Sequence, residues 1–173
     1  MDTQEAILTR KSTRAFSNAA VSKDNIDAIV KAGAASPVAM ARYDTLHITV
    51  IMDPEAMRLI NLATDELVFS LSGVKRNTDY GAPAMILVSA MEEDGGYEKY
   101  NVGIVIENMV ISATALGIDS VIVGGAPVAI KQDVSLMERL NIPAGFTPSL
   151  GVLLGYAKEP TAPKQHTITT DFV

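Results

Sequence analysis

The stretch PAMILVSAM, residues 83–91, is a continuous apolar run with the length of one β-strand. A strand that is apolar at every position has no face left for water, so it is expected in a sheet that other elements cover on both sides. This stretch therefore predicts a buried strand inside a layered fold.

The next segment along the chain, residues 97–116, is the longest helix candidate and would span about 30 Å. Gly117 follows it, where a left-handed C-cap belongs. From Val102 onward the helix is apolar nearly all round, which predicts burial on every side, by its own domain and by a partner chain.

The remaining elements mix helices and strands without a strict β-α-β alternation, and this favours an α+β fold. Ser22 is the expected N-cap of one helix, and Pro37 ends it. Neither an internal repeat nor a linker is visible, so residues 1–173 are interpreted as a single domain. The other expected helices are residues 2–10, 23–35, about 54–71 and 127–140; the other expected strands are residues 45–52, 120–123 and 150–155; residues 11–16 are extended, and residues 159–173 form a tail.

The end of the tail, HTITTDFV, resembles a strand with nothing after it to pack against. Such a terminus is expected to add to the edge of a sheet, its own or a neighbour's.

The amino-acid composition of the chain argues against several classes of function. The chain has 173 residues, 48% hydrophobic, with 14 basic and 20 acidic residues and a net charge of -6. This acidic balance argues against nucleic-acid binding, which needs clustered Lys and Arg. The chain has no cysteine and two histidines, so thiolate catalysis and a histidine metal triad are not expected. With no hydrophobic leader and no long uninterrupted apolar segment, a soluble cytoplasmic protein without membrane contact is expected.

The densest polar cluster is residues 10–14, where three cations and two hydroxyls occupy five positions. In an extended segment Arg10, Ser12 and Arg14 would point the same way and offer two guanidinium groups and a hydroxyl to a phosphate. Taken alone, such a run favours the plainer alternative of a solvated helix end.

Other candidates are weaker when each is considered alone. Gly124-Gly125 follows a strand, where backbone amides can approach a ligand closely, but taken alone the pair is better explained by a plain turn into the helix at Pro127. Residues 36–40 (SPVAM) either floor a pocket or only end a helix. Lys75 and Arg76 fall in a loop and are expected to be solvated. Lys164 and His166 are either ligand contacts or solubilising residues of the tail.

Taken together, in their order along the chain, these features indicate one family more specifically than any of them does alone. An Arg-x-Ser-x-Arg-x-Phe pattern at residues 10–16 follows a helix, and Ser36-Pro37 ends another. Gly81-Ala82-Pro83 precedes an apolar strand, residues 113–118 (ATALGI) close the long helix, and Leu154-Gly155-Tyr156 precedes a basic tail. From residue 4 to about residue 166 the sequence thus resembles the nitroreductase family of FMN-dependent oxidoreductases.

The resemblance implies an α+β fold in which helices flank a central, mostly antiparallel sheet, and an intertwined homodimer whose residues 159–173 pack on the partner protomer. The resemblance implies neither a catalytic side chain nor a metal ion. It implies instead that FMN accepts hydride at N5 from NADH or NADPH and passes it to a nitroaromatic, quinone or similar small acceptor by a ping-pong mechanism. The implied FMN contacts are Arg10, Ser12, Lys164 and His166 at the phosphate, Arg14 and Lys11 at the ribityl chain and the N1/O2 edge, Pro37, Val38, Ala39 and Met40 from the other protomer, and the Gly124-Gly125 backbone near N5.

Three departures from the family pattern qualify these roles. Residues 37–45 read PVAMARYDT, so Ala41 replaces the asparagine whose amide normally reads the flavin pyrimidine. His166 stands where arginine is common, which makes phosphate binding pH-dependent. The chain has little room after Gly81 or before Pro127 for covering helices, so an open pocket is expected.

Two other functions stay open at this point. The first is an FMN-binding storage or sensing module without efficient NAD(P)H turnover, motivated by the missing amide and the missing cover. The second is a dimeric structural domain whose basic cluster binds any anion.

Overall fold

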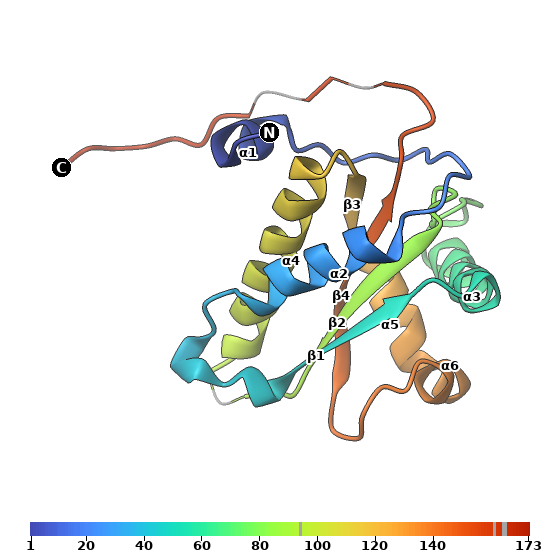
Figure 1. The fold of residues 1–173 in the computed structure, drawn as a ribbon. Coiled ribbons are helices and arrows are strands. Elements are labelled where there is room, and N and C mark those ends of the chain that lie inside the picture. The colour runs from blue at the N-terminus through green and yellow to red at the C-terminus, as the bar shows by residue number, and fades with distance from the viewer. Residues whose placement is uncertain (94, 161, 164–165) are drawn as a thin grey trace.

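Strand β2 (Ala84–Ala90) lies between two other strands and is buried along its whole length, as its apolar sequence predicts. The computed structural model describes residues 1–93, 95–160, 162–163 and 166–173. It shows one four-stranded sheet in the order β1-β2-β4-β3, with antiparallel pairing throughout (Figure 1). The other strands are β1 (Leu46–Ile51), β3 (Asp119–Val123) and β4 (Thr147–Gly155). The predicted α+β fold with an antiparallel sheet is confirmed.

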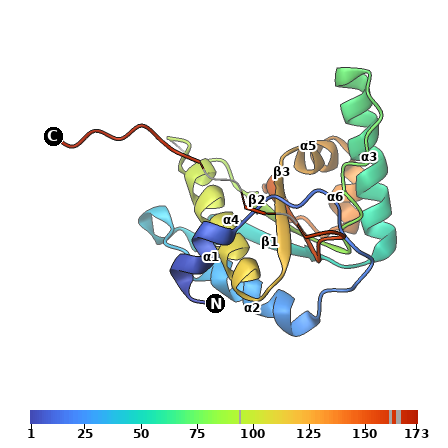
Figure 2. The same ribbon diagram turned by 90° about the horizontal axis from the view of Figure 1, so that it is seen from above.

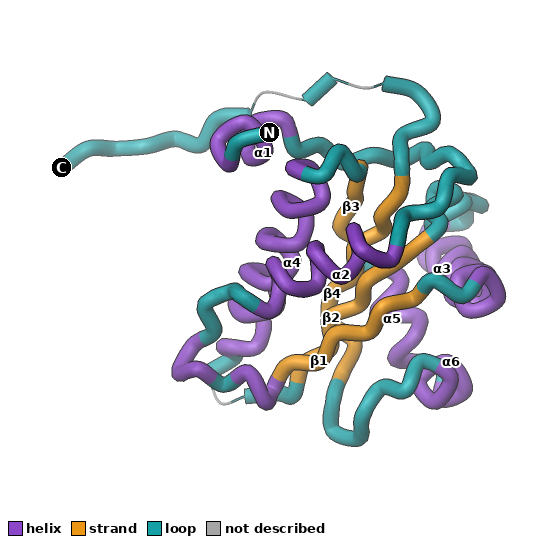
Figure 3. The backbone as a smooth tube through the Cα atoms, viewed as in Figure 1, coloured by secondary structure: helices purple, strands orange, loops and turns teal. Residues whose placement is uncertain are grey.

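Helices cover both faces of this sheet (Figures 2 and 3). On one face α2 (Lys23–Ala34) and α4 (Tyr97–Ala115) form a core with Ile86 and Val88 of β2. On the other face α3 (Pro54–Ser72), α5 (Gly125–Gln132) and α6 (Val134–Arg139) form a second core with Met85 and Leu87. Because successive strand residues face opposite sides, one apolar run serves both cores.

Capping groups fix the helix ends where the sequence predicts them. The Ser22 hydroxyl accepts a hydrogen bond from the Asn25 N–H at the start of α2, and Asp53 accepts one from the Ala56 N–H at the start of α3. Gly117, after α4, has a φ of 74°, a left-handed conformation that glycine adopts without a steric penalty. The other helices of the described chain are α1 (Thr3–Thr9) and two single-turn 3-10 helices, η1 (Ala39–Ala41) and η2 (Tyr43–Thr45).

The single helix expected over residues 127–140 is wrong in detail. The structure has two helices there, because Asp133 leaves helical geometry (φ -116°, ψ 104°) and its carboxylate accepts hydrogen bonds from the Ser135 and Leu136 N–H groups. Aspartate favours such a cap over a helix interior. The first of the two helices also begins earlier than expected, at Gly125.

Two further expectations involve a second protomer and are not tested by a single chain. Helix α4 is not buried on every side: Tyr100, Ile104 and Glu107 are exposed on it. Residues 166–173 form no strand with the sheet of this chain, and Ile168 and Phe172 are exposed. Burial of these surfaces by a second protomer stays a prediction. Within the described ranges, every helix is too short or too polar to cross a bilayer.

Candidate functional site

Residues 10–17 run in extended conformation across one end of the sheet, held by backbone hydrogen bonds to β3 and to the segment that leaves β4 (Figure 1). The Thr13 N–H donates to the Ser120 carbonyl at 2.9 Å, and the Ser17 N–H donates to the Tyr156 carbonyl at 2.8 Å. In return, the Lys158 N–H donates to the Ala15 carbonyl at 2.9 Å. The segment between the first helix and the second is therefore fixed between two strand ends.

The carboxylate of Asp119, the first residue of β3, joins the same segments through side-chain contacts. It accepts hydrogen bonds from the Thr13 hydroxyl at 3.1 Å and from the Ala157 N–H at 3.0 Å. The Lys11 ammonium lies 3.4 Å from it. One partly buried carboxylate thus holds both the amino-terminal segment and the chain that continues into the tail.

These segments enclose a cavity of about 700 Å³, here named the basic cavity. Residues 10–15 form one wall, and residues from the carboxyl-terminal part of the chain form the other. The structure thus brings His166 together with Arg10, Ser12 and Arg14, whereas Lys164 lies outside the described residues. The second wall consists of Lys158, Glu159, Ala162 and His166.

Six consecutive residues of the extended segment, 10–15, line this cavity. Thr13 and Phe16 are buried, whereas Ser12 and Arg14 are exposed. The cavity therefore carries several cations and a hydroxyl, with Glu159 as the acidic residue of its described lining. Such a donor set suits a phosphate or another anion.

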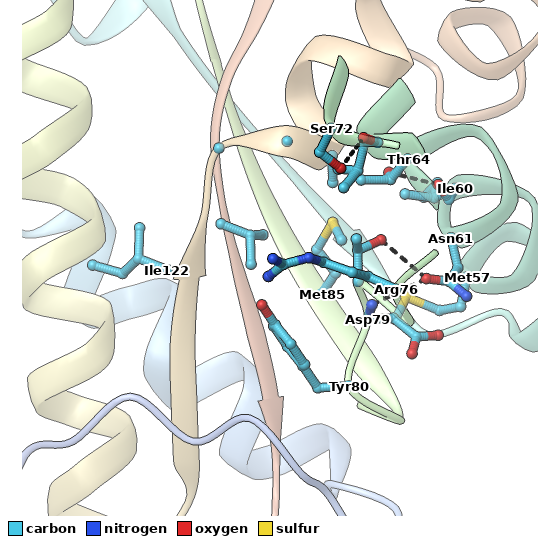
Figure 4. A pocket seen from close by; sticks show the side chains of 16 residues that line it. Met57, Ile60, Asn61, Thr64, Ser72, Arg76, Asp79, Tyr80, Met85 and Ile122 are labelled. Atoms are coloured by element: carbon cyan, nitrogen blue, oxygen red, sulfur yellow. Dashed lines mark hydrogen bonds between the residues drawn. The ribbon is translucent and has the colours of Figure 1, made fainter. Parts of the chain in front are cut away.

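A second cavity of about 320 Å³, here named the glycine cavity, adjoins the other end of β3 (Figure 4). Gly124 and Gly125 line it where β3 passes into α5. Helix α3, the loop of residues 73–81 and β2 supply the remaining wall. Its lining is Met57, Ile60, Asn61, Thr64, Val68, Ser72, Arg76, Thr78, Asp79, Tyr80, Met85, Ile122, Val123, Gly124, Gly125 and Ala126.

The backbone at the glycine pair is accessible to a ligand. A Cβ atom on Gly124 would have no neighbour within 4 Å, and one on Gly125 would lie 3.3 Å from Thr64 Cγ2. No side chain of the described residues caps the amino terminus of α5. Its first N–H groups are therefore free to meet electron-rich atoms of a bound molecule.

The loop of residues 73–81 is fixed to α3 by hydrogen bonds. Asp65 Oδ1 accepts from both the N–H and the hydroxyl of Thr78, at 2.9 and 2.7 Å. Asn61 Oδ1 accepts from the Asp79 N–H at 3.0 Å. Tyr80 has a φ of 54°, a conformation unusual outside glycine and frequent at functional sites. The side chains of Arg76 and Tyr80 extend into the glycine cavity from this loop (Figure 4).

The predicted segment of Pro37, Val38, Ala39 and Met40 lines neither cavity of this chain. It lies beside α4, where the Ala39 N–H donates to Asn101 Oδ1 at 3.0 Å. Met40 has a φ of 53° and is 73% exposed. An exposed methionine held by a fixed backbone is available to another molecule, so the prediction that this segment serves a second protomer stays open.

Sequence reasoning missed several residues of these sites. Asp119 and Asn61 carry no motif, and each acts through contacts with residues far away in the chain. Arg76 is exposed, as expected for a loop residue, but it also lines the glycine cavity. In the part of the chain that the structure describes, no three His, Asp or Glu residues gather to hold a metal ion.

Comparison with known proteins agrees with this geometry. Residues 7–156 match the sequence pattern of the Nitroreductase family. A protein of Archaeoglobus fulgidus, provisionally named an NADH dehydrogenase/NAD(P)H nitroreductase, is 30% identical over 160 residues, which cover 88% of this chain and 84% of that protein.

Solved structures show the same fold. A nitroreductase with bound FMN from Desulfitobacterium hafniense superposes with a TM-score of 0.86 at 25% identity, covering 99% of this chain and 100% of that one. Another, also with bound FMN, from Bacteroides fragilis superposes with a TM-score of 0.86 at 23% identity, covering 100% of this chain and 97% of that one. The chain therefore belongs to the nitroreductase family.

Proposed function

We propose that this chain holds FMN along β3, with the phosphate in the basic cavity and the flavin ring at the glycine cavity, and passes electrons from NADH or NADPH to a small acceptor. The family to which it belongs comprises FMN-dependent NAD(P)H oxidoreductases. The observation that carries the placement is that the two cavities adjoin opposite ends of one strand. The four residue steps of extended chain from Ser120 to Gly124 span about 13 Å, a length suited to a mononucleotide.

The residues of the basic cavity fit the phosphate end. Arg10 and Ser12 would donate hydrogen bonds to its oxygens, and His166 and Lys164 would add positive charge from the tail. Arginine forks and hydroxyls are the usual partners of phosphate in proteins. The cations of residues 10–14 lie on a segment that is fixed by Asp119 and by backbone hydrogen bonds, so little ordering of that segment is needed on binding.

At the other end, the backbone of Gly124 and Gly125 would allow close approach of the ring at N5. When bound, FMN supplies the hydride acceptance and donation, and the protein supplies position and charge. Arg14, with Lys11, would favour negative charge at the N1/O2 edge. With Ala41 in place of the usual asparagine, backbone groups would have to read the pyrimidine. The acceptor, a nitroaromatic, quinone or similar molecule, would use the place that the nicotinamide leaves, in a ping-pong sequence.

A second protomer would complete each site. The segment of Pro37, Val38, Ala39 and Met40 would line the partner's flavin, and residues 159–173 would pack on the partner. Exposed apolar groups on α4, among them Tyr100 and Ile104, give a homodimer a surface to bury.

A spectrum of the purified protein tests the function. We expect a yellow protein that retains FMN, and bleaching of its flavin band on anaerobic addition of NADH or NADPH. Subsequent addition of a nitroaromatic or a quinone should restore the band. A colourless protein that takes up no FMN would contradict the proposal.

The alternative, a storage or sensing module, is favoured by one observation, the missing pyrimidine-reading amide at Ala41. The same spectrum distinguishes it from the enzyme. Bleaching by dithionite, but by neither nicotinamide nucleotide, would select the module.

A further inference from the structure

We propose that, beside a flavin ring held at Gly124-Gly125, the part of the glycine cavity lined by α3 selects an aromatic acceptor that carries a negatively charged group, with its ring against the apolar wall and its anionic group at Arg76. This inference rests on the proposed function and names the substrate class of the same site. It assigns a specificity role to Arg76, a residue that its place in an exposed loop would otherwise leave as surface charge.

The apolar wall of the glycine cavity suits a flat ring. Met57, Ile60 and Met85 line it, and each is less than 10% exposed. The polar groups within this wall already have partners: the Thr64 hydroxyl donates to the Ile60 carbonyl at 2.7 Å, and Asn61 Oδ1 accepts from the loop. A ligand ring that covers the wall therefore leaves no polar group without a partner.

Two polar groups in the cavity are free to bind a ligand. Arg76 and Tyr80 extend toward β3 with their polar ends close together (Figure 4). Neither side chain forms a hydrogen bond or an ion pair with any residue that the structure describes. The loop that carries them is fixed by Asp65 and Asn61, so the two groups have a defined position over the wall.

The described lining holds one cation, Arg76, and one carboxylate, Asp79, so an anion is favoured at the position of Arg76 rather than by the net charge of the cavity. Asp79 is the acidic residue in the described lining, and its Oδ1 accepts a hydrogen bond from the Gly81 N–H at 2.7 Å. Asp65, outside the lining, is engaged by Thr78. The uncapped amino terminus of α5 adds partial positive charge opposite Arg76. A planar carboxylate matches the guanidinium fork, whereas a neutral substituent does not.

The test compares 4-nitrobenzoate with the neutral 4-nitrobenzamide on the FMN-loaded full chain. Two quantities are measured: kcat/KM for each acceptor, and the dissociation constant of each by calorimetry with the flavin kept oxidised and no nicotinamide present. We expect Arg76→Ala to weaken binding and kcat/KM for the benzoate by roughly fivefold, the upper limit for a solvent-accessible ion pair with fork geometry. The benzamide should change less than twofold.

Lys75→Ala is the matched control, because it removes the same charge from the neighbouring loop residue, which does not line the cavity. It should leave both acceptors unchanged. Arg76→Lys should retain part of the preference, since the charge stays and the fork is lost.

Equal loss for both acceptors, or an equal effect of Lys75→Ala, would overturn the inference while the proposed function stands. An altered flavin reduction potential in Arg76→Ala, with no change in benzoate binding, would likewise overturn it and assign Arg76 to the cofactor. If the chain takes up no FMN, the proposed function fails. Calorimetry on the flavin-free chain then decides the anion site: Arg76-dependent benzoate binding would support it, and no binding would overturn it.

Discussion

The basic cavity and the glycine cavity adjoin opposite ends of β3, and the chain builds them in different ways. The cations of the basic cavity come mainly from one short segment, residues 10–14, which lines the cavity with consecutive residues and is held in extended conformation by backbone hydrogen bonds. The glycine cavity is assembled from α3, the loop of residues 73–81, β2 and the start of α5.

This difference suits two separate tasks: binding of a cofactor at the basic cavity and selection of an acceptor at the glycine cavity. A charged motif on a fixed segment suits a group that is the same in every turnover, such as the phosphate of a resident cofactor. A cavity whose wall and polar groups lie on separate elements can vary in one element without disturbing the others. Mutations at the two cavities should therefore have separable effects, and the following predictions test that separation.

The largest effect is expected from Arg10→Ala in the basic cavity. Loss of a charged hydrogen-bond donor to the phosphate should weaken FMN binding by about 1.5–3 kcal/mol, roughly 10- to 150-fold. Fluorescence titration with FMN and with riboflavin, which lacks the phosphate, checks this. Riboflavin affinity should not change, and Lys31→Ala, which removes an exposed charge at the end of α2, should affect neither ligand. Unchanged FMN affinity would refute the assignment of Arg10.

A smaller effect is expected from Gly155→Ala, which acts on the basic cavity through packing. A Cβ at this position would lie 2.8 Å from both Phe16 Cδ1 and Pro83 Cδ. Because Phe16 is buried and anchors the segment of residues 10–16, overpacking should cost about 1–3 kcal/mol of stability and weaken FMN binding. Thermal unfolding and FMN titration measure the two effects.

Gly124→Ala is the matched glycine substitution for this test. Its φ of -103° is accessible to alanine, and its Cβ would meet nothing within 4 Å. The unfolding temperature of the flavin-free protein should therefore not fall. If Gly124→Ala destabilised the chain as much as Gly155→Ala does, the packing argument would be wrong.

The elements that could be predicted from the sequence are those whose signals are local. The apolar run of β2, the Ser22 cap and the glycine after α4 each act within a few residues of themselves, and the structure bears them out. The break at Asp133 was missed because the stretch around it continues a helical pattern, and only the cap geometry shows that the aspartate ends one helix and begins another.

The same distinction holds for the site. Residues 10–14 could be identified because their charges are adjacent in sequence. Arg76 could not be identified in this way, because the residues that line the glycine cavity with it are distant in sequence. Met57 and Gly124, for example, lie 19 and 48 positions away, and only the packing of α3 against α5 brings them together. Asp119 was missed for a similar reason, since its contacts are with Thr13 and Ala157.

Asp119→Asn tests whether this anchor organises the basic cavity. The amide keeps one acceptor oxygen, but it loses the charge beside Lys11 and turns a donor toward groups that donate. We expect a loss of about 1 kcal/mol in stability and a few-fold weaker FMN binding. Benzoate binding at the glycine cavity, measured at saturating FMN, should not change. Glu66→Gln, an equal charge change at an exposed position of α3, is the control; an equal effect there would show that only net charge matters.

The smallest effect is expected from Asp53→Asn, at the start of the helix that carries one wall of the glycine cavity. The hydrogen bond from Arg139, at 2.9 Å, and the one from the Ala56 N–H lower the pKa of Asp53 from its ordinary value of 3.8. The stability that this carboxylate contributes is therefore complete above the unfolded-state pKa and is lost as the pH falls through the lower folded-state pKa. The variant should unfold at a slightly lower temperature than the parent at pH 7, with the difference narrowing in acid and in high salt, because the pair is exposed. Since α3 also carries Asn61 and Thr64, any change in ligand affinity should appear for benzoate and not for FMN phosphate. If the difference in unfolding temperature between variant and parent widened below pH 4, the assigned lowering of the Asp53 pKa would be contradicted.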